Sequence, residues 1–205
     1  SQAFLRRWYF VLRHGRVGHC QAYSMKKIIV VTGGAGFVGS NLIKFFLKQT
    51  NLKIISLDNY SSSSKKNHIK SKRIKYIKGH TKDISKILFN YKKNIHTIFH
   101  FGEFSRIFQS FKKLHECLDS NSNGSREVFK FCLDNKIKLI YSATSASLGN
   151  KGNDENLSPY AFTKSKNLEL LQNLKTWFNL KFEVIYFYNI YGPGQIKTGE
   201  MATVI

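Results

Sequence analysis

The sequence predicts an α/β protein with a doubly wound parallel sheet whose two faces are covered by helices. Three observations support this fold class. From Met25 onward, apolar strand-like runs alternate with helical stretches. The first such run leads into a glycine-rich turn that is followed at once by a helix. In addition, 42% of the 205 residues are hydrophobic, which is enough for one sizeable core and excludes an intrinsically disordered chain.

The predicted elements alternate along the chain. Apolar runs of five or six residues are typical of buried strands, and longer stretches with apolar residues on one face are typical of helices. Asp83 is placed to cap the helix that follows it. Because helices connect successive strands, the strands should run parallel. We expect strands at 27–32, 53–57, 73–77, 96–101, 138–142 and 182–187, and helices at 37–49, 84–91, 120–135 and 159–178.

Basic residues outnumber acidic ones by 33 to 12, which gives a formal charge of +21. Most are lysines spread along the chain, and the only arginines after Met25 are Arg73, Arg106 and Arg126. A nucleic-acid-binding surface would more often show clustered arginine among aromatic residues, so the sequence argues against nucleic acid and is compatible with an anionic substrate. No run of about 18 uncharged apolar residues occurs, so no membrane-spanning helix is expected.

Residues 1–24 differ from the rest, because they contain four arginines but no lysine and no acidic residue. They are either an arginine-rich targeting peptide or, as we favour, translated sequence upstream of a start at Met25. This leader is therefore left out of the fold prediction. The cysteines Cys20, Cys117 and Cys132 form no C-x-x-C pair. Neither a disulfide framework nor a metal site is expected, and a reducing cytoplasm is the expected location.

A phosphate-binding loop is predicted where the first strand meets the first helix. Gly33, Gly36 and Gly39 follow the spacing G-x-x-G-x-x-G. The first glycine permits a tight turn, the second lets backbone N–H groups approach a pyrophosphate, and the third lets the helix pack closely on the sheet. The positive end of the helix dipole would then face the anion.

Asp58 ends the second strand, 25 residues after Gly33. A carboxylate at this place accepts hydrogen bonds from the adenosine ribose and repels a 2′-phosphate, so NAD is favoured over NADP. The nearby Lys65 and Lys66 weaken this preference slightly.

Tyr160 and Lys164 form a Y-x-x-x-K pair on the helix predicted over 159–178. Their side chains share one helix face, where the ammonium stabilises the phenolate and makes Tyr160 a usable proton acceptor. The pair alone is a weak signal, because Tyr23 and Lys27 form a second match. Thr144, which follows the fifth strand, adds a hydroxyl group near the same place.

The segments TGGAGFVGSN, LDN, HFGEFSR, NSNG, YSATS, SPYAFTK and YNIYGPGQ occur in this order. Together they resemble the extended short-chain dehydrogenase/reductase family, and within it the NAD-dependent nucleotide-sugar epimerases and dehydratases of the UDP-glucose 4-epimerase type. The resemblance covers residues 25–205. It implies a Rossmann-type NAD-binding domain at 25–192 and the start of a substrate-binding part at 193–205.

The resemblance also implies roles for individual residues. The catalytic residues would be Thr144, Tyr160 and Lys164, and the nucleotide sugar would contact Thr144, Tyr188 and Asn189. The cofactor would contact Gly33, Gly36, Phe37, Val38, Gly39, Asp58, Asn59, Phe101, Gly102, Glu103, Asn121, Tyr160 and Lys164.

The implied activity is epimerisation of a nucleotide sugar such as UDP-glucose or UDP-galactose at C4 through a 4-keto sugar. Tyr160 would take the hydroxyl proton while hydride passes to NAD, with Thr144 bonded to the same oxygen and Lys164 to the nicotinamide ribose. Dehydratases of the family usually carry an Asp-Glu pair after the hydroxyl residue, whereas Ser145 and Ala146 follow here, which favours an epimerase. A dehydratase, a reductase and a non-catalytic NAD- or RNA-binding relative stay open as alternatives.

The sequence departs from the family pattern at three places. His80 stands where the family usually has an aspartate that contacts adenine, and Tyr186 stands where it has an arginine. The chain ends at Ile205, whereas family members continue through most of a substrate-binding domain. We therefore expect a C-terminally truncated and inactive chain, whose full-length form leaves room for a homodimer.

Overall fold

The computed structural model describes residues 27–145, 154, 156–188 and 190–195. Within them lies a six-stranded sheet in the order β3-β2-β1-β4-β5-β6, and every pairing is parallel. This is the Rossmann order, so the predicted doubly wound class is confirmed. The strands are β1 (Ile28–Thr32), β2 (Lys53–Asp58), β3 (Ile74–Lys78), β4 (Ile95–His100), β5 (Lys138–Thr144) and β6 (Phe182–Phe187).

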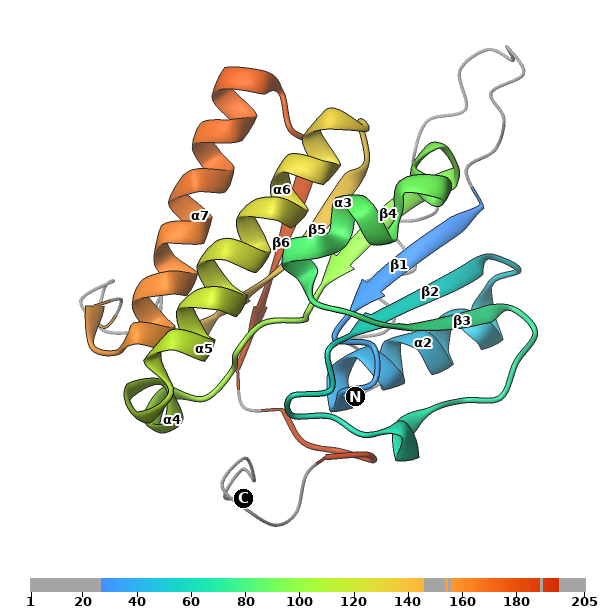
Figure 1. The fold of residues 1–205 in the computed structure, drawn as a ribbon, viewed down its shortest axis with the longest axis horizontal. Coiled ribbons are helices and arrows are strands. Elements are labelled where there is room, and N and C mark those ends of the chain that lie inside the picture. The colour runs from blue at the N-terminus through green and yellow to red at the C-terminus, as the bar shows by residue number, and fades with distance from the viewer. Residues whose placement is uncertain (1–26, 146–153, 155, 189, 196–205) are drawn as a thin grey trace.

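Helices cover both faces of the sheet (Figure 1). The cluster of buried residues on one face includes side chains of α3, α6 and α7, and the cluster on the other face includes side chains of α2. The helices are α2 (Phe37–Gln49), α3 (Ile84–Ile87), α4 (Ile107–Lys112), α5 (Leu114–Leu118), α6 (Ser125–Asp134) and α7 (Pro159–Phe178). Short 3₁₀ turns occupy Lys65–Asn67, Thr81–Asp83 and Phe89–Asn94, and a π-helical segment occupies Asp119–Gly124.

The central strand β1 separates the two cores, because successive side chains of a strand point to opposite faces. Ile28 and Val30 belong to the core under α3, α6 and α7, whereas Ile29 and Val31 belong to the core under α2. All five residues of β1 are buried, as expected of a central strand in a parallel sheet.

Two predicted helices and one cap differ from the structure, and α4 and α5 were not predicted. The helix expected over 120–135 is α-helical only from Ser125 to Asp134, after the π-helical segment. The helix expected over 84–91 is α-helical only to Ile87 and is followed by a 3₁₀ turn. Asp83 makes no capping hydrogen bond, so the predicted cap is wrong. The 3₁₀ turn at Thr81–Asp83 starts the helical segment earlier, and His80 caps that turn by accepting the Lys82 N–H at 3.1 Å.

The carboxyl ends of β1 and β4 form the switch point of the sheet, where dinucleotides bind in doubly wound folds. Gly33 follows β1 with φ +69°, a left-handed conformation that favours glycine. A Cβ atom on Gly33 would lie 2.8 Å from the carbonyl of Phe101, which follows β4. The two loops are therefore packed backbone against backbone.

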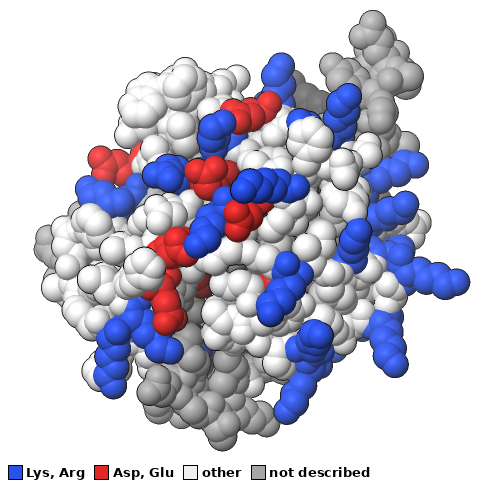
Figure 2. Space-filling model, viewed as in Figure 1, with Lys and Arg blue, Asp and Glu red and all other residues white. Residues whose placement is uncertain are grey.

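Basic side chains are spread over the face that Figure 2 shows. Acidic side chains alternate with them over the left half of this view, whereas the right edge shows basic side chains among the described residues (Figure 2). On this face the positive charge is dispersed rather than gathered in one groove. No helix in the described part of the chain has both the length and the apolar character that crossing a membrane requires.

Candidate active site

The glycine loop between β1 and α2 leaves the first turn of α2 able to bind an anion. The Gly33 N–H donates to the Leu57 carbonyl at 2.8 Å, and the Gly36 N–H donates to the Gly33 carbonyl at 3.1 Å, which closes the turn. Gly36 is the N-cap of α2 and provides no side-chain cap. The first-turn amides, which include those of Phe37 and Val38, are therefore the kind of donors that hold phosphate groups.

The third glycine has a packing role that the spacing alone predicted. A Cβ atom on Gly39 would lie 2.3 Å from the Gly33 carbonyl oxygen and 2.7 Å from the Gly34 Cα. On Gly36, a Cβ atom would lie 3.2 Å from the same oxygen. Any larger residue at position 39 would push α2 away from the loop, so the loop and helix fit a pyrophosphate only with glycine there.

Asp58 connects the loop after β2 to the glycine loop. Its Oδ1 accepts the Tyr60 N–H and the Ser63 hydroxyl, each at 2.8 Å, and its Oδ2 accepts the Ala35 N–H at 2.9 Å. Because Oδ2 accepts a single one of these bonds, it retains capacity for a ribose hydroxyl. The neighbouring Asn59 is exposed and accepts a hydrogen bond from the N–H of residue 61. These residues fit the adenosine end of a dinucleotide.

Lys164 lies in a buried, fully bonded position at the carboxyl end of β5. Its Nζ donates to Glu103 Oε2, to the Ser142 carbonyl at 2.5 Å and to the Ser142 hydroxyl at 3.2 Å. These three acceptors match the three N–H donors of an ammonium group. The side chains of Lys164 and Glu103 are only 4% and 2% exposed, so this is a buried ion pair.

The other oxygen of Glu103 is equally well occupied. Its Oε1 accepts hydrogen bonds from the Ser125 hydroxyl at 2.7 Å, the Tyr141 hydroxyl at 3.0 Å and the Asn167 amide at 3.2 Å. Burial by itself raises the pKa of Glu103, but the adjacent Lys164 ammonium and these donors outweigh it and hold the pKa below its usual value. Glu103 is therefore a carboxylate at neutral pH.

A chain of hydrogen bonds extends from Glu103 back to the switch point. The Ser125 hydroxyl donates to Glu103, so it accepts from His100 Nε2 at 2.9 Å. His100 Nδ1 is then the acceptor of the Thr32 hydroxyl at 2.7 Å, and the Thr32 oxygen in turn accepts the Gly102 N–H at 3.0 Å. This directional network assigns His100 the neutral Nε2–H tautomer. Burial lowers the pKa of His100 to about 4, in agreement with that assignment.

The start of α7 is fixed by local sequence. Ser158 caps the helix by accepting the Ala161 N–H at 3.0 Å, and Pro159 occupies the first turn, as is common at this position. Tyr160 is therefore in the first turn and half-buried, one turn before Lys164. Its backbone N–H donates to the Ser110 hydroxyl at 3.3 Å.

The remaining predicted site residues lie at different depths. Thr144 ends β5 and is buried, Phe101 packs edge-to-face on Phe187 of β6, and Tyr188 is 66% exposed directly after β6. Asn121 is fully buried, and its amide pairs with both backbone groups of residue 104, at 2.7 and 3.0 Å, and with the residue 163 hydroxyl. Asn189 lies outside the described residues. The structure thus brings Glu103, Thr144, Tyr160 and Lys164 to one end of β4, β5 and α7, whereas the roles of the individual residues stay predictions.

Besides Tyr141, five polar residues of the network had no role in the sequence prediction. Thr32, His100 and Ser142 lie at the carboxyl ends of apolar strands, and a polar residue there was a signal that could have been used. Ser125 and Asn167 lie on helices, and nothing in their local sequence marks them. All five are buried: Thr32, His100, Ser125, Ser142 and Asn167.

The fold and this site together define a dinucleotide-binding protein with a tyrosine-lysine pair near its switch point. A model of the NAD dependent epimerase/dehydratase family matches residues 29–205. The chain therefore belongs to the NAD-dependent epimerase/dehydratase family. Because this family is NAD-dependent, the predicted cofactor is confirmed at the level of the family.

Individual relatives agree with this assignment. The chain is 30% identical to the ADP-L-glycero-D-manno-heptose-6-epimerase of Brachyspira hyodysenteriae, in an alignment covering 86% of this chain and 59% of the relative. It is 27% identical to a UDP-N-acetylglucosamine 4-epimerase from Methanobrevibacter ruminantium M1, solved with UDP-N-acetylmuramic acid (TM-score 0.76; 88% and 60% covered). It is 25% identical to the Bordetella bronchiseptica enzyme WbmF, solved with NAD⁺ (TM-score 0.74; 84% and 52% covered). The chain thus spans about 60% or less of the length of these relatives.

We expect the buried His100 to make the protein acid-sensitive. Its folded-state pKa of about 4 lies below the ordinary value of 6.5, so the unfolded chain binds the proton first. The stability contributed by the neutral ring is complete above pH 6.5 and is lost as the pH falls toward 4. The loss should amount to about 3 kcal/mol, at roughly 1.4 kcal/mol per pH unit. Urea unfolding followed by circular dichroism from pH 7.5 to pH 4 measures it.

The matched control is His100→Gln, which keeps a donor toward Ser125 but does not titrate. The variant should be less stable at pH 7 and should lose less stability between pH 6.5 and 4. Parallel pH profiles for the two proteins would contradict the assignment of a neutral His100.

Proposed function

We propose that the whole protein is an NAD-dependent nucleotide-sugar epimerase acting at C4 through a 4-keto sugar, most simply on a UDP-sugar. The observation that carries this proposal is the placement of Lys164 at the carboxyl end of β5, one helical turn after Tyr160. The same sheet edge carries the glycine loop and Asp58. The similarity to proteins described as epimerases supports the reaction class. The position of the carbon and the identity of the sugar rest on the sequence resemblance.

The residues of this chain would divide the work between binding and proton transfer. The glycine loop and the first turn of α2 would hold the pyrophosphate, and Asp58 would hold the adenosine ribose. When bound, NAD supplies a reversible acceptor for the hydride of the sugar carbon. Tyr160 would exchange the hydroxyl proton, the Thr144 hydroxyl would bond the same oxygen, and Lys164 would supply the positive charge beside the reacting centre.

The proposal also includes a subsite for the nucleotide sugar and a cellular location. Tyr188 and Asn189 would begin the nucleotide-sugar subsite. We place the protein in the cytoplasm, because Cys117 and Cys132 are buried free thiols, as is usual in a reducing compartment.

A product assay tests the reaction class. The whole protein is incubated with NAD and a panel of nucleotide sugars, and the products are separated by chromatography. Interconversion of two epimers with no net change in NADH absorbance is expected. Loss of water from the sugar would establish a dehydratase, net NADH formation or consumption would establish a dehydrogenase or reductase, and no turnover with any sugar would oppose the proposal.

Cofactor preference should follow from Asp58. Isothermal titration of the 205-residue chain should show tighter binding of NAD than of NADP, because the Asp58 carboxylate repels a 2′-phosphate. The isosteric variant Asp58→Asn should narrow this difference by removing the charge. Its amide oxygen can still accept from Tyr60 and Ser63, whereas the bond from the Ala35 N–H is lost because an amide NH2 group does not accept. Equal or tighter binding of NADP by the unmodified chain would refute the prediction.

Tyr160→Phe should separate proton transfer from cofactor binding in the whole protein. The phenol oxygen exchanges the proton, so turnover should fall by at least about 10²-fold while NAD affinity stays nearly unchanged. Lys164→Met should lower both, because it removes the positive charge beside the cofactor and Tyr160, and Thr144→Ala should cost less than Tyr160→Phe. Steady-state rates and calorimetric titrations measure the two quantities. Near-normal turnover of the Tyr160→Phe variant would contradict the epimerase proposal.

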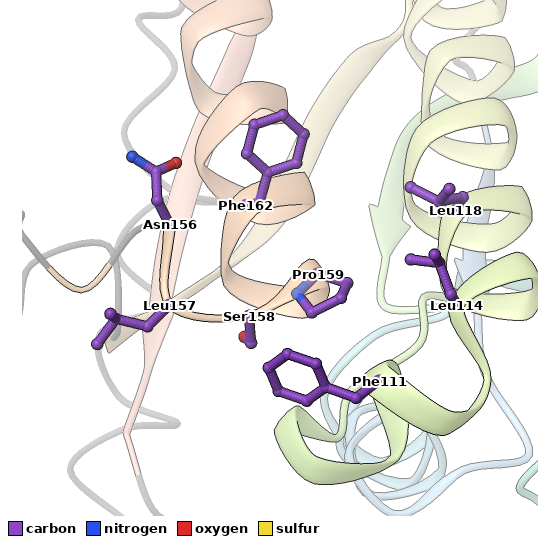
Figure 3. A pocket seen from close by; sticks show the side chains of 8 residues that line it. All are labelled: Phe111, Leu114, Leu118, Asn156, Leu157, Ser158, Pro159 and Phe162. Atoms are coloured by element: carbon purple, nitrogen blue, oxygen red, sulfur yellow. The ribbon is translucent and has the colours of Figure 1, made fainter.

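We also infer that the whole protein forms a homodimer through α4, α5 and α7. Large apolar side chains are exposed there, among them Phe108 (65%), Phe111 (59%) and Phe162 (44%). Figure 3 shows Leu114 and Leu118 of α5 across from Phe162 and Pro159 of α7, around an apolar hollow of about 400 Å³. Exposed apolar patches of this kind mark association surfaces.

Light scattering of the whole protein should give the mass of a dimer, and the variant Phe111→Asp should give the mass of a monomer. A monomeric mass for the unmodified protein would contradict the proposed homodimer.

A further inference from the structure

Both carboxylate oxygens of Glu103 accept hydrogen bonds from side chains of the protein itself. Its two oxygens together receive side-chain donors from Ser125, Tyr141, Asn167 and Lys164, and the Ser142 hydroxyl adds a longer contact to Oε2 at 3.5 Å. A carboxylate offers about four lone-pair sites, so little capacity remains for a ribose hydroxyl. The geometry therefore separates Glu103 from residues such as Asp58, whose Oδ2 keeps acceptor capacity.

We propose that Glu103 is a positioning residue that holds the Lys164 ammonium charged and fixed at the carboxyl end of β5. The proposal rests on the function proposed above, because Lys164 matters there as the charge beside the cofactor and Tyr160. Glu103 acts through Lys164 and needs no contact with cofactor or substrate.

A buried ammonium requires a buried counter-charge, and Glu103 supplies it. Taking Lys164 out of water is strongly unfavourable unless an opposite charge with good geometry lies beside it. The titratable groups packed around the pair are His100 from β4, Tyr141 from β5, Cys117 from α5 and Tyr160 from α7. Burial holds the pKa of His100 low and the pKa values of Cys117 and Tyr141 high, so these three groups are uncharged at neutral pH.

The position of the carboxylate is itself fixed from three directions. The network through Ser125, His100 and Thr32 ties Oε1 to the backbone of Gly102, which lies against the glycine loop. Tyr141 reaches it from β5 and Asn167 from the next turn of α7. The Asn167 amide also donates to the Asn121 carbonyl at 2.7 Å, which anchors it to the π-helical segment. A carboxylate held in this way can place the ammonium to within a narrow range of positions.

The pH dependence of amine modification at Lys164 tests the charge-holding role directly, without NAD and without turnover. The 205-residue chain and its Glu103→Gln variant are briefly treated with acetic anhydride at a series of pH values, and modification at each lysine is measured by peptide mass spectrometry. Only the neutral amine reacts. Loss of the counter-charge should therefore move the pH midpoint for Lys164 down by about one unit or more, a tenfold rise in reactivity near neutrality.

Two controls separate charge from access. Lys166 lies on the same helix, pairs with Glu169 in solvent and should keep its midpoint in both proteins. Glu103→Asp retains the charge and should restore much of the Lys164 midpoint. A purely structural role for Glu103 would raise the extent of labelling without moving the midpoint, and that result would overturn the proposal.

A double-mutant cycle on NAD affinity tests whether Glu103 acts through Lys164. Calorimetry of Glu103→Gln should show NAD affinity reduced by about tenfold, the effect of one charge-assisted hydrogen bond. In Glu103→Gln/Lys164→Met, affinity should be no lower than in Lys164→Met alone, because the carboxylate has nothing left to position. Additive losses would identify a direct cofactor contact and refute the proposal.

The labelling and calorimetry experiments distinguish a failure of this proposal from a failure of the function proposed above. If the unmodified chain does not bind NAD, the function proposed above is wrong, while the labelling midpoint still decides whether Glu103 holds the charge of Lys164. If Glu103→Gln does not fold, Glu103→Asp and the double variant still decide it. The double variant carries no unpaired buried charge and should fold, whereas its failure to fold would show that Glu103 serves the fold rather than Lys164.

Discussion

The organisation of the site depends on one requirement, which is that a lysine ammonium at the end of β5 must be compensated inside the protein. Lys164 and Glu103 are almost completely excluded from solvent. Such a pair persists only if both charges are fully hydrogen-bonded, because the cost of desolvation otherwise exceeds the attraction. The network from Thr32 to Asn167 meets this condition with side chains from β1, β4, β5, α6 and α7.

This polar network lies where two apolar cores meet the carboxyl edge of the sheet. The central strand β1 is buried on both faces, and the polar groups of the network lie toward the carboxyl ends of the strands: Thr32 ends β1, His100 ends β4, and Ser142 lies near the end of β5. The same edge carries the glycine loop, whose shape depends on the close approach of Gly33 to Phe101. The glycine loop and the network around the buried ion pair therefore lie side by side, and Gly102 contacts both, because it packs against Gly33 and its N–H donates to Thr32.

The net charge of +21 has little to do with this arrangement. The charged pair at the site is balanced internally, and the visible lysines are dispersed over the surface (Figure 2). An overall positive field would favour the approach of the anionic nucleotide sugar proposed above, by raising its local concentration rather than by specific contact. Specific recognition has to come from the groups at the strand ends.

The sequence by itself determined the parallel α/β class, the positions of the six strands and of α2 and α7, the glycine loop, and the tyrosine-lysine pair, whereas α4 and α5 were not predicted. These features depend on local spacing, because hydrophobic period, glycine positions and helix-face neighbours are set within a few residues. The sequence could not assign the cap before α3, because a 3₁₀ turn starts that segment earlier and gives the cap to His80. Nor could it assign the partner of Glu103. That partner is 61 residues away, and the two meet only because β4 and β5 pair in register while α7 packs on β5. Burial is the physical reason for this dependence. Only in the folded protein are the charges of Glu103 and Lys164 removed from water, and a buried charge then requires the opposite charge beside it.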